Sequence, residues 1–165
     1  MLEIRKFGDP VLKSRATPVK KFDESLARLA GEMIETMHAS EGVGLAANQV
    51  GYLKRILVAT ADDKDYVLVN PEIRERSSEV VTSTEGCLSI PHVQVDVERA
   101  RRVVVSGQDL QGDPVEIEAE EPLAIILQHE IDHLDGILIL DRTDRESRKR
   151  ALREMRERTL AGRQQ

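Results

Sequence analysis

The stretch LAIILQHEIDH, Leu123–His133, combines an apolar run with two histidines and two acids. Its length and its flanking residues predict a helix that begins near Pro122, a residue suited to a first helical turn, and ends at Gly136. The apolar start LAIIL predicts that this helix is buried. Ionisable side chains in a buried helix require partners or a function, because burial without them costs free energy.

Histidines four residues apart on a helix point the same way, so His129 and His133 present two imidazoles to one point. Glu130 lies beside that point without having to coordinate there. This is the H-E-x-x-H arrangement of metal-dependent hydrolases, with two nitrogen ligands and a carboxylate that acts on water. The pattern alone is of moderate specificity, and a surface helix with two uninvolved histidines is the alternative.

A catalytic metal of this kind needs a third protein ligand and one open coordination position. In many HExxH peptidases the third ligand is a downstream histidine, but the corresponding position here is Ile139, which cannot coordinate. Glutamates in the charged C-terminal segment have solvent exposure as their simpler explanation, and isolated histidines are usually structural. These weaker candidates are Glu146, Glu154, His38 and His92.

Cys87 is the only cysteine, in the segment EGCLSIP, Glu85–Pro91. A small buried apolar side chain is the alternative interpretation of a free cysteine. Gly86 permits a close backbone approach, and a thiolate at this point completes a Cys–His–His site. The ligands of such a site carry one negative charge, so the site keeps a net positive charge when it holds a divalent ion. This charge lowers the pKa of water bound to the metal. We therefore predict that Cys87 is a metal ligand.

The remaining pattern predicts an α+β protein in which mostly antiparallel strands pack around the central HExxH helix. An amphipathic helix precedes the strands, with Asp23 placed to cap it and Gly42 to end it. A further helix begins where Thr143 and Glu146 have capping-box spacing. The expected helices cover 22–40, 122–136 and 144–162, and the expected strands lie within 55–60, 66–73, 93–99 and 101–120.

Length and composition exclude several classes of protein. With 165 residues, 40% hydrophobic content, two Phe, two Tyr and no Trp, the chain predicts one domain, 1–165, with an aliphatic core. A net charge of −6 argues against DNA binding, and no segment approaches the ~20 apolar residues of a membrane span. One cysteine and no export signal predict a cytoplasmic protein of a bacterium, with an organelle as the alternative.

Three segments in order resemble the motifs of one family, the metal-dependent peptide deformylases of bacteria and organelles. GVGLAANQVG, Gly42–Gly51, resembles the glycine-rich first motif with its glutamine, EGCLS resembles the second and HEIDH the third. The opening GDPVLK and the spacing between the motifs also fit. The resemblance implies a hydrolase that removes the N-formyl group from formyl-methionine at the start of new proteins and releases formate.

The resemblance also assigns roles to individual residues. It implies metal ligation by Cys87, His129 and His133, with Glu130 as acid and base. It implies that the Gln49 side chain and the Leu88 backbone N–H stabilise the oxyanion. Gly44 is expected to bind the substrate backbone. An apolar pocket for the methionine side chain is expected to have walls from four residues, each of which has core packing as its alternative: Val43, Leu123, Ile125 and Ile126.

Cys–His–His ligation does not select one metal. Zn²⁺ fits the ligand types, while imidazole and thiolate also suit Fe²⁺. The resemblance favours one Fe²⁺ ion, with Zn²⁺, Ni²⁺ and Co²⁺ as alternatives. We expect the enzyme to act as a monomer. Its basic C-terminal helix, 144–162, is either a solvated, ion-paired helix or, as the resemblance implies, a contact to ribosomal RNA.

Two other functions fit part of the pattern. A general HExxH metallopeptidase would hold its metal without Cys87. A non-catalytic homologue that binds formylated N-termini, or a structural metal module, would need no acid–base group, and closed structural zinc sites use four protein ligands. Three visible ligands beside an intact Glu130 favour an enzyme.

Overall fold

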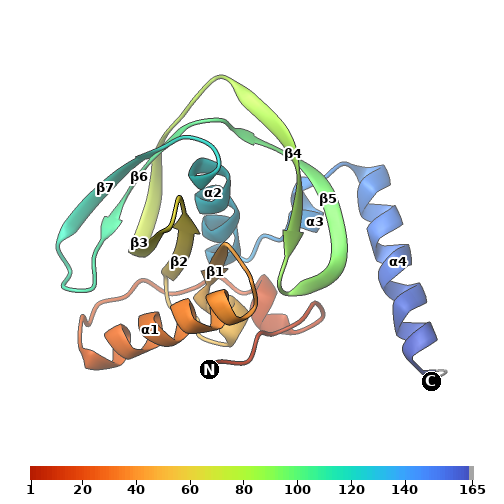
Figure 1. Cartoon of the computed structure of the whole chain (residues 1–165), viewed down its shortest axis with the longest axis horizontal. Helices are drawn as coiled ribbons and strands as arrows, with labels where there is room; N and C mark the ends of the chain where they lie inside the picture. The colour runs from red at the N-terminus through yellow and green to blue at the C-terminus, as the bar shows by residue number, and fades with distance from the viewer. Residues whose placement is uncertain (164–165) are drawn as a thin grey trace.

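A computed structural model describes residues 1–163, and the last two residues of the predicted domain, 164–165, lie outside it. Figure 1 shows two groups of strands on either side of a central helix, α2, with α4 projecting at one end. The order of elements along the chain is η1 (Pro10–Lys13), α1 (Glu24–Ala39), β1 (Gly44–Ala46), η2 (Ala47–Val50), β2 (Ile56–Ala61), β3 (Lys64–Arg76), β4 (Val80–Cys87), β5 (Ile90–Ala100), β6 (Val103–Gln108), β7 (Pro114–Ala119), α2 (Leu123–Leu134), α3 (Ile139–Arg142) and α4 (Arg145–Arg163).

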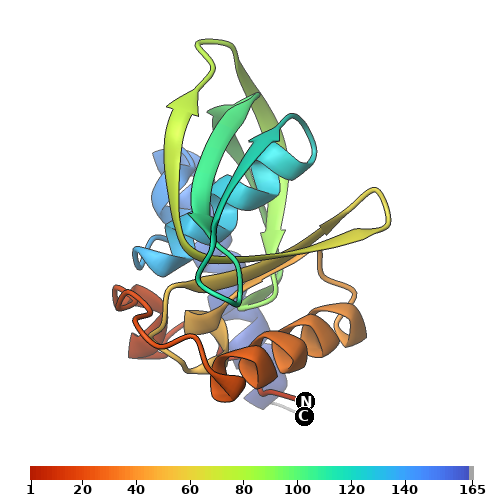
Figure 2. The same cartoon turned by 90° about the vertical axis from the view of Figure 1, so that its left-hand side faces the viewer.

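The larger sheet has five strands in the order β1-β2-β3-β6-β7, and every neighbouring pair is antiparallel. Its strand β2 is buried on both faces, because alternate side chains serve two cores. Ile56 and Val58 pack with the apolar face of α1, while Leu57 and Ala59 pack with α2. The sheet therefore separates α1 from α2, and α1 lies beneath it in Figure 2.

The smaller sheet is the antiparallel hairpin of β4 and β5. Val93, Val95 and Val97 are buried and the residues between them are exposed, which confirms the alternation read from the sequence. The inward face of β5 packs on η1, α3 and Ala151 of α4. Strand β4 was not expected, because its residues are mostly polar or exposed and carry no apolar alternation.

Helix α2 lies between the two sheets, in contact with β1, β2, β3 and β5. Ala124, Leu127, Ile131 and Leu134 join the core of the five-stranded sheet. The α+β class, with antiparallel strands around this helix, is confirmed. No helix in residues 1–163 combines the length and the apolar character that crossing a membrane requires.

Several predicted helix ends need correction. Asp23 caps α1 by accepting the Leu26 N–H at 3.1 Å, as expected. The helix ends at Ala39, however, and the left-handed residue after it is Glu41 (φ 57°) rather than Gly42. At α4, Asp144 accepts the Ser147 N–H at 2.8 Å, so the cap is Asp144 and not the predicted Thr143 box. Thr143 instead donates its hydroxyl to the Asp96 carbonyl.

Gly136 ends α2 in a conformation that only glycine adopts easily. Its φ is +75°, and a Cβ atom would lie 2.5 Å from the Lys13 carbonyl oxygen. We expect Gly136→Ala to lower the free energy of unfolding by about 2 kcal/mol or more, measured by chemical denaturation. Gly31→Ala, in the open on α1, is the control and should raise stability by ~0.5–1 kcal/mol. Equal effects of the two substitutions would contradict this account.

Candidate metal centre

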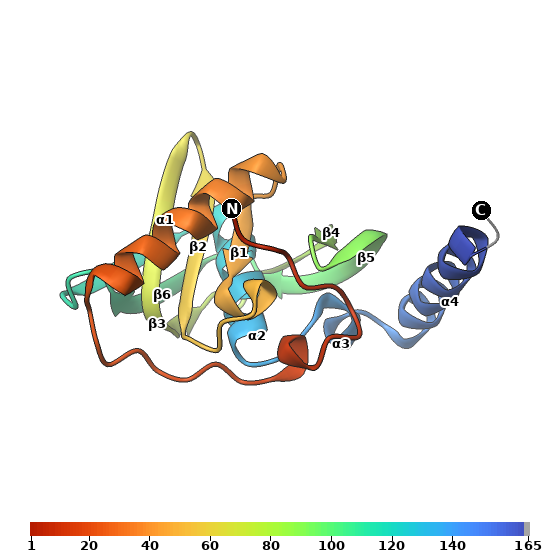
Figure 3. The same ribbon diagram turned by 90° about the horizontal axis from the view of Figure 1, so that it is seen from below.

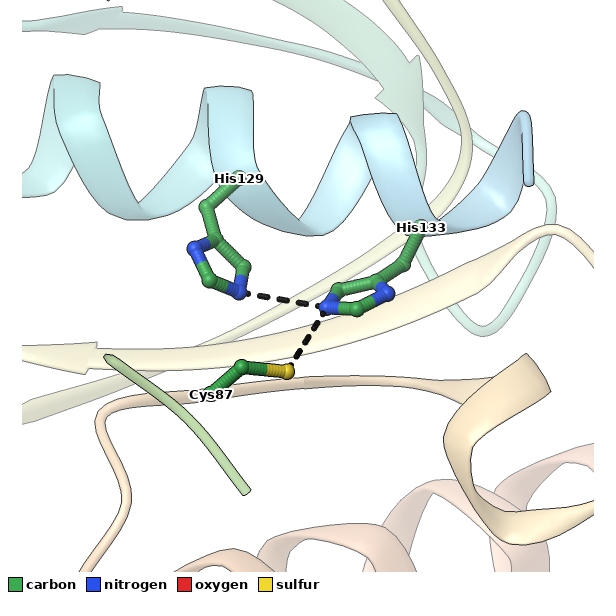
Figure 4. A group of neighbouring side chains, drawn as sticks. All are labelled: Cys87, His129 and His133. Atoms are coloured by element: carbon green, nitrogen blue, oxygen red, sulfur yellow. Dashed lines mark hydrogen bonds between the residues drawn. The ribbon is translucent and has the colours of Figure 1, made fainter. Parts of the chain in front are cut away.

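Three side chains from two elements meet beneath the β4–β5 turn. Figure 4 shows His129 and His133 one helical turn apart on α2, both pointing at the Cys87 sulfur at the end of β4. His133 Nε2 lies 3.3 Å from Cys87 Sγ and 3.1 Å from His129 Nε2. The three ligand atoms lie within 4.8 Å of one another. Two ring nitrogens and one sulfur that face one point form a donor set whose residue types fit a divalent transition metal.

A buried chain of charges holds His129 in this orientation. His129 Nδ1 lies 2.9 Å from Glu85 Oε1, which leaves Nε2 free for the metal. Arg99 donates to both Glu85 oxygens at 2.6 and 3.0 Å and to Asp132 at 2.9 Å. Asp132 also accepts two bonds from Arg142, at 3.0 and 2.9 Å. These linked side chains therefore join β4, β5, α2 and α3 around the metal site.

Sequence reasoning missed these supporting residues, although a signal was present. Arg99 follows Val93, Val95 and Val97 at alternate positions, so it points to the same buried face as the valines. An inward arginine on a strand requires a carboxylate partner. The first acid of EGCLSIP, Glu85, is that partner. Burial opposes the ionisation of Glu85, but hydrogen bonds from His129 and Arg99 hold its pKa below the usual value.

The electrostatics of the cluster favour positive charge at His129. Burial alone would lower the pKa of His129, but Glu130, Cys87 and Glu85 around it raise that pKa to about 10. Burial, with the neighbouring His129, sets the pKa of His133 well below its usual value. A metal ion requires unprotonated ligands and therefore competes with the proton of His129. The negative groups that stabilise this proton also attract a divalent cation.

Glu130 lies beside the metal ligands without belonging to their group. Its Oε2 is 3.8 Å from His129 Nε2, and Oε1 is buried without a hydrogen-bond partner in the described part of the chain. Burial raises the pKa of Glu130 to about 7, a range suited to a group that accepts and returns a proton. Gly44 makes room for this carboxylate, because a Cβ atom there would lie 2.5 Å from Glu130 Oε2.

Gln49 approaches the same point from the opposite wall. Its segment, the glycine-rich first motif, forms the short strand β1 and the single turn of helix η2. Gln49 Oε1 accepts the Ala46 N–H at 3.0 Å, which turns the amide nitrogen toward the metal ligands. That nitrogen donates to Ser89 Oγ at 3.1 Å and lies 3.6 Å from Cys87 Sγ. The neutral amide of Gln49 is thus held beside the metal ligands as a hydrogen-bond donor.

A cleft of about 890 Å³ opens onto the cluster. Val43, with 55% of its surface exposed, forms part of its rim. Leu123 is not among the residues that line the cleft and packs on the core of the five-stranded sheet, which is the alternative given for it above. His133, almost fully buried, lies below the cleft. The other predicted site residues that line it are Gly44, Gln49, Cys87, Leu88, Ile125, Ile126, His129 and Glu130.

The weaker ligand candidates lie outside the metal group. His38 pairs with Asp65 on the surface at 2.9 Å. His92 and Glu154 line the cleft, but their side chains do not join the cluster of ligand atoms. Glu146 lies in the first turn of α4. Among residues 1–163, Cys87 is the third ligand that the geometry provides.

Comparisons with known proteins agree with this site. Residues 1–149 match the family model for polypeptide deformylase. A peptide deformylase of Dictyoglomus thermophilum is 53% identical over 147 residues, which are 89% of this chain and 95% of that protein. The crystal structure of a peptide deformylase from Thermotoga maritima has a TM-score of 0.86 at 48% identity and covers 87% of this chain and 98% of that chain. One from Legionella pneumophila has a TM-score of 0.91 at 38% identity, with coverage of 100% and 99%.

The contact between Gly44 and Glu130 leads to a prediction about stability. Gly44→Ala should destabilise the metal-free protein by about 1–3 kcal/mol, because the methyl group overlaps the Glu130 carboxylate. The same substitution should cost much less in a Glu130→Ala background, where the overlapping atoms are gone. Chemical denaturation of the four proteins measures this coupling. Gly86→Ala is the control, since its Cβ atom would have no neighbour closer than 3.7 Å. Equal losses in both backgrounds would contradict the account.

Proposed function

The chain belongs to the peptide deformylase family, and from this premise we propose how its cleft residues divide the work of the reaction. Members of the family remove the N-formyl group from newly made peptides, and this protein is accordingly a metal-dependent hydrolase of formyl-methionine peptides that releases formate. The convergence of Cys87, His129 and His133 on one point is the observation that supports the proposed site most strongly.

Hydrolysis of an amide needs an activated nucleophile and a protonated leaving group. Cys87, His129 and His133 would hold the cation, which as a Lewis acid acidifies water and polarises a carbonyl. Glu130 accepts the proton of the attacking water and delivers a proton to the departing amine. Its burial, its pKa near 7 and an Oε1 atom without a hydrogen-bond partner among residues 1–163 support this role, since that oxygen is available to accept a proton.

The developing negative charge on the formyl oxygen needs donors that are already in place. We assign this role to the Gln49 side-chain amide and the Leu88 backbone N–H. The hydrogen bond between Gln49 Oε1 and the Ala46 N–H supports it, because it presents the amide N–H groups to the cluster. Loss of one such donor typically costs ~3–4 kcal/mol of transition-state stabilisation.

The cleft offers an apolar wall beside these polar groups. Val43, Ile125 and Ile126 are proposed to receive the methionine side chain, and Gly44 to bind the peptide backbone. All four line the cleft, and Val43 and Gly44 occupy the segment that enters β1, next to Glu130. A formylated peptide bound there would place its carbonyl between Gln49 and the metal ligands.

Two further properties of the protein are proposed. We infer Fe²⁺ as the native ion from the likeness to the peptide deformylase motifs, with Zn²⁺, Ni²⁺ and Co²⁺ as alternatives, because Cys–His–His ligation by itself does not select one metal. We infer a monomer. We also infer that it acts in the bacterial cytoplasm, with an organelle as the alternative, because its substrate is a newly made formylated peptide.

The division of roles is tested by two substitutions. Glu130→Gln should retain one metal ion per chain and lose formate release from a formyl-Met tripeptide by at least ~10²-fold, because the acid–base group is gone. Cys87→Ala should lose the metal as well, whereas a general HExxH peptidase would keep it. Metal analysis and a formate assay measure both. Formate release by Glu130→Gln at the wild-type rate would overturn the assignment.

The identity of the metal has its own test. Protein prepared without oxygen and loaded with Fe²⁺ should turn over formyl-Met peptide faster than the Zn²⁺ form, and exposure to air should reduce that rate. The comparison requires equal metal occupancy in the two preparations. Equal turnover of the two forms would contradict the choice of iron.

We also propose that α4 contacts ribosomal RNA. Ala151 is buried, and Leu152 and Met155 pack with it against the β4–β5 hairpin, so one side of α4 is anchored. Three exposed arginines lie about one turn apart: Arg150, Arg153 and Arg156. Exposed basic side chains at this spacing are suited to contacts with a phosphate backbone.

Substitution of these three arginines by glutamine should weaken ribosome binding about tenfold or more and make it less dependent on salt. The apolar anchor of α4 is untouched, whereas deletion of the helix would expose it. A variant with Lys20, Lys21 and Arg28 changed to glutamine removes the same charge near α1 and should bind like wild type. Cosedimentation with ribosomes at several salt concentrations measures the difference. Equal binding by all three proteins would refute the proposal.

A further inference from the structure

The first residues of the chain contribute to the wall of the cleft. Figure 3 shows this segment running from beside α1 toward α3. The Leu2 N–H donates to Thr36 Oγ1 of α1 at 3.0 Å. Beyond it, residues 4–7, which we call the N-terminal strap, pass between η2 and the β4–β5 turn. Ile4 and Lys6 of the strap line the cleft itself.

The strap is hydrogen-bonded to both motifs that supply the proposed oxyanion donors. The Arg5 N–H donates to the Gln49 carbonyl at 2.6 Å. The Phe7 N–H donates to the Ser89 carbonyl at 2.8 Å. Between them, Lys6 Nζ donates to the Leu88 carbonyl at 3.3 Å. Three consecutive strap residues therefore contact Gln49, Leu88 and the neighbour of Leu88.

These contacts join parts of the protein that otherwise belong to different sheets. Gln49 lies in η2, which continues from β1 of the five-stranded sheet, while Leu88 lies in the turn of the two-stranded sheet. Gln49 Nε2 also donates to Ser89 Oγ at 3.1 Å, but that bond depends on the side chain that must serve the substrate. The strap bonds fix the backbone of both donors independently.

The path of the strap is accommodated by the local backbone. Gly51, which ends η2, has a φ of +87°, and a Cβ atom there would lie 3.0 Å from the Arg5 guanidinium. Arg5 also pairs with Asp9 at 3.4 Å. The absence of a side chain at Gly51 thus leaves space for the Arg5 guanidinium. The side chain of Arg5 is held there by Asp9, and its backbone N–H by Gln49.

We propose that the N-terminal strap is a positioning element that sets the separation of Gln49 and the Leu88 N–H. This inference rests on the oxyanion roles proposed for these two groups. Two donors on separate elements stabilise an oxyanion only when both lie within hydrogen-bond distance of it, and small displacements reduce the rate steeply. Arg5, Lys6 and Phe7 touch no reacting atom and act through Gln49, Leu88 and Ser89.

Proline substitutions remove the two backbone donors. Arg5→Pro and Phe7→Pro should each lower kcat for formyl-Met peptide about tenfold, with KM and metal content unchanged, because only the placement of the donors is altered. Glu3→Pro is the matched control, since the Glu3 N–H has no hydrogen-bond partner in residues 1–163. It introduces the same ring in the same segment and should have wild-type kcat. Loss of kcat in Glu3→Pro equal to that in Arg5→Pro would overturn the proposal.

A double-mutant cycle separates positioning from general damage to the fold. In a Gln49→Ala background, Arg5→Pro should reduce kcat by no more than about twofold, because the group it positions is absent. The same fold-loss in both backgrounds would show that the strap acts elsewhere and would overturn the proposal. Formate release by wild type and by Glu3→Pro is measured alongside. If neither releases formate, the proposed function has failed, and not the role of the strap.

Lys6 allows a test that leaves the backbone intact, for the case in which a proline variant does not fold. Lys6→Met should lower kcat about threefold at constant KM, and Lys6→Arg, which keeps a cationic donor, should recover most of the loss. Thermal melting shows whether each variant is folded. Wild-type kcat in Lys6→Met, together with unfolded proline variants, would overturn the proposal.

Discussion

The structure depends on one energetic constraint, the burial of ionisable side chains on a helix packed between two sheets. Unpaired, a buried carboxylate or guanidinium costs several kcal/mol. Here His129, Glu85, Arg99, Asp132 and Arg142 form a continuous chain in which each group contacts the next. Removal of Arg99, which is bonded to both acids, would leave Glu85 and Asp132 each with one cationic partner fewer. The β4–β5 hairpin must therefore dock on α2 in one register.

The same register also brings the metal ligands together. Glu85 and Cys87 are two residues apart on β4, so the docking that pairs Glu85 with His129 brings the sulfur to His133. The histidine spacing on α2 is local, but the third ligand arrives only because the charges of the hairpin are satisfied there. Positive charge is favoured at His129, and the same surroundings favour a cation. Structural stability and metal binding thus share the same residues.

The cleft joins segments that are distant in the sequence. The wall of β1 and η2 brings Gly44 against Glu130 and turns the Gln49 amide inward. The β4–β5 turn supplies Leu88 from the other sheet, and the N-terminal strap is bonded to both. A small enzyme with an aliphatic core obtains a precise polar site in this way, because backbone hydrogen bonds hold the segments of Gln49 and Leu88 while the buried side chains of Glu85 and Arg99 hold His129.

Local patterns in the sequence were enough to predict α2, the spacing of its histidines, the alternation of Val93, Val95 and Val97, and the β6–β7 hairpin. They predicted these because helix and strand periodicity depend on near neighbours. The tertiary structure decided what near neighbours do not determine: the polar strand β4, the packing of Leu123 on the sheet core, the left-handed Glu41 and the pairing of Glu85 with Arg99. Each of these is set by a partner far along the chain, since a buried charge or an apolar face is stabilised only by what packs against it.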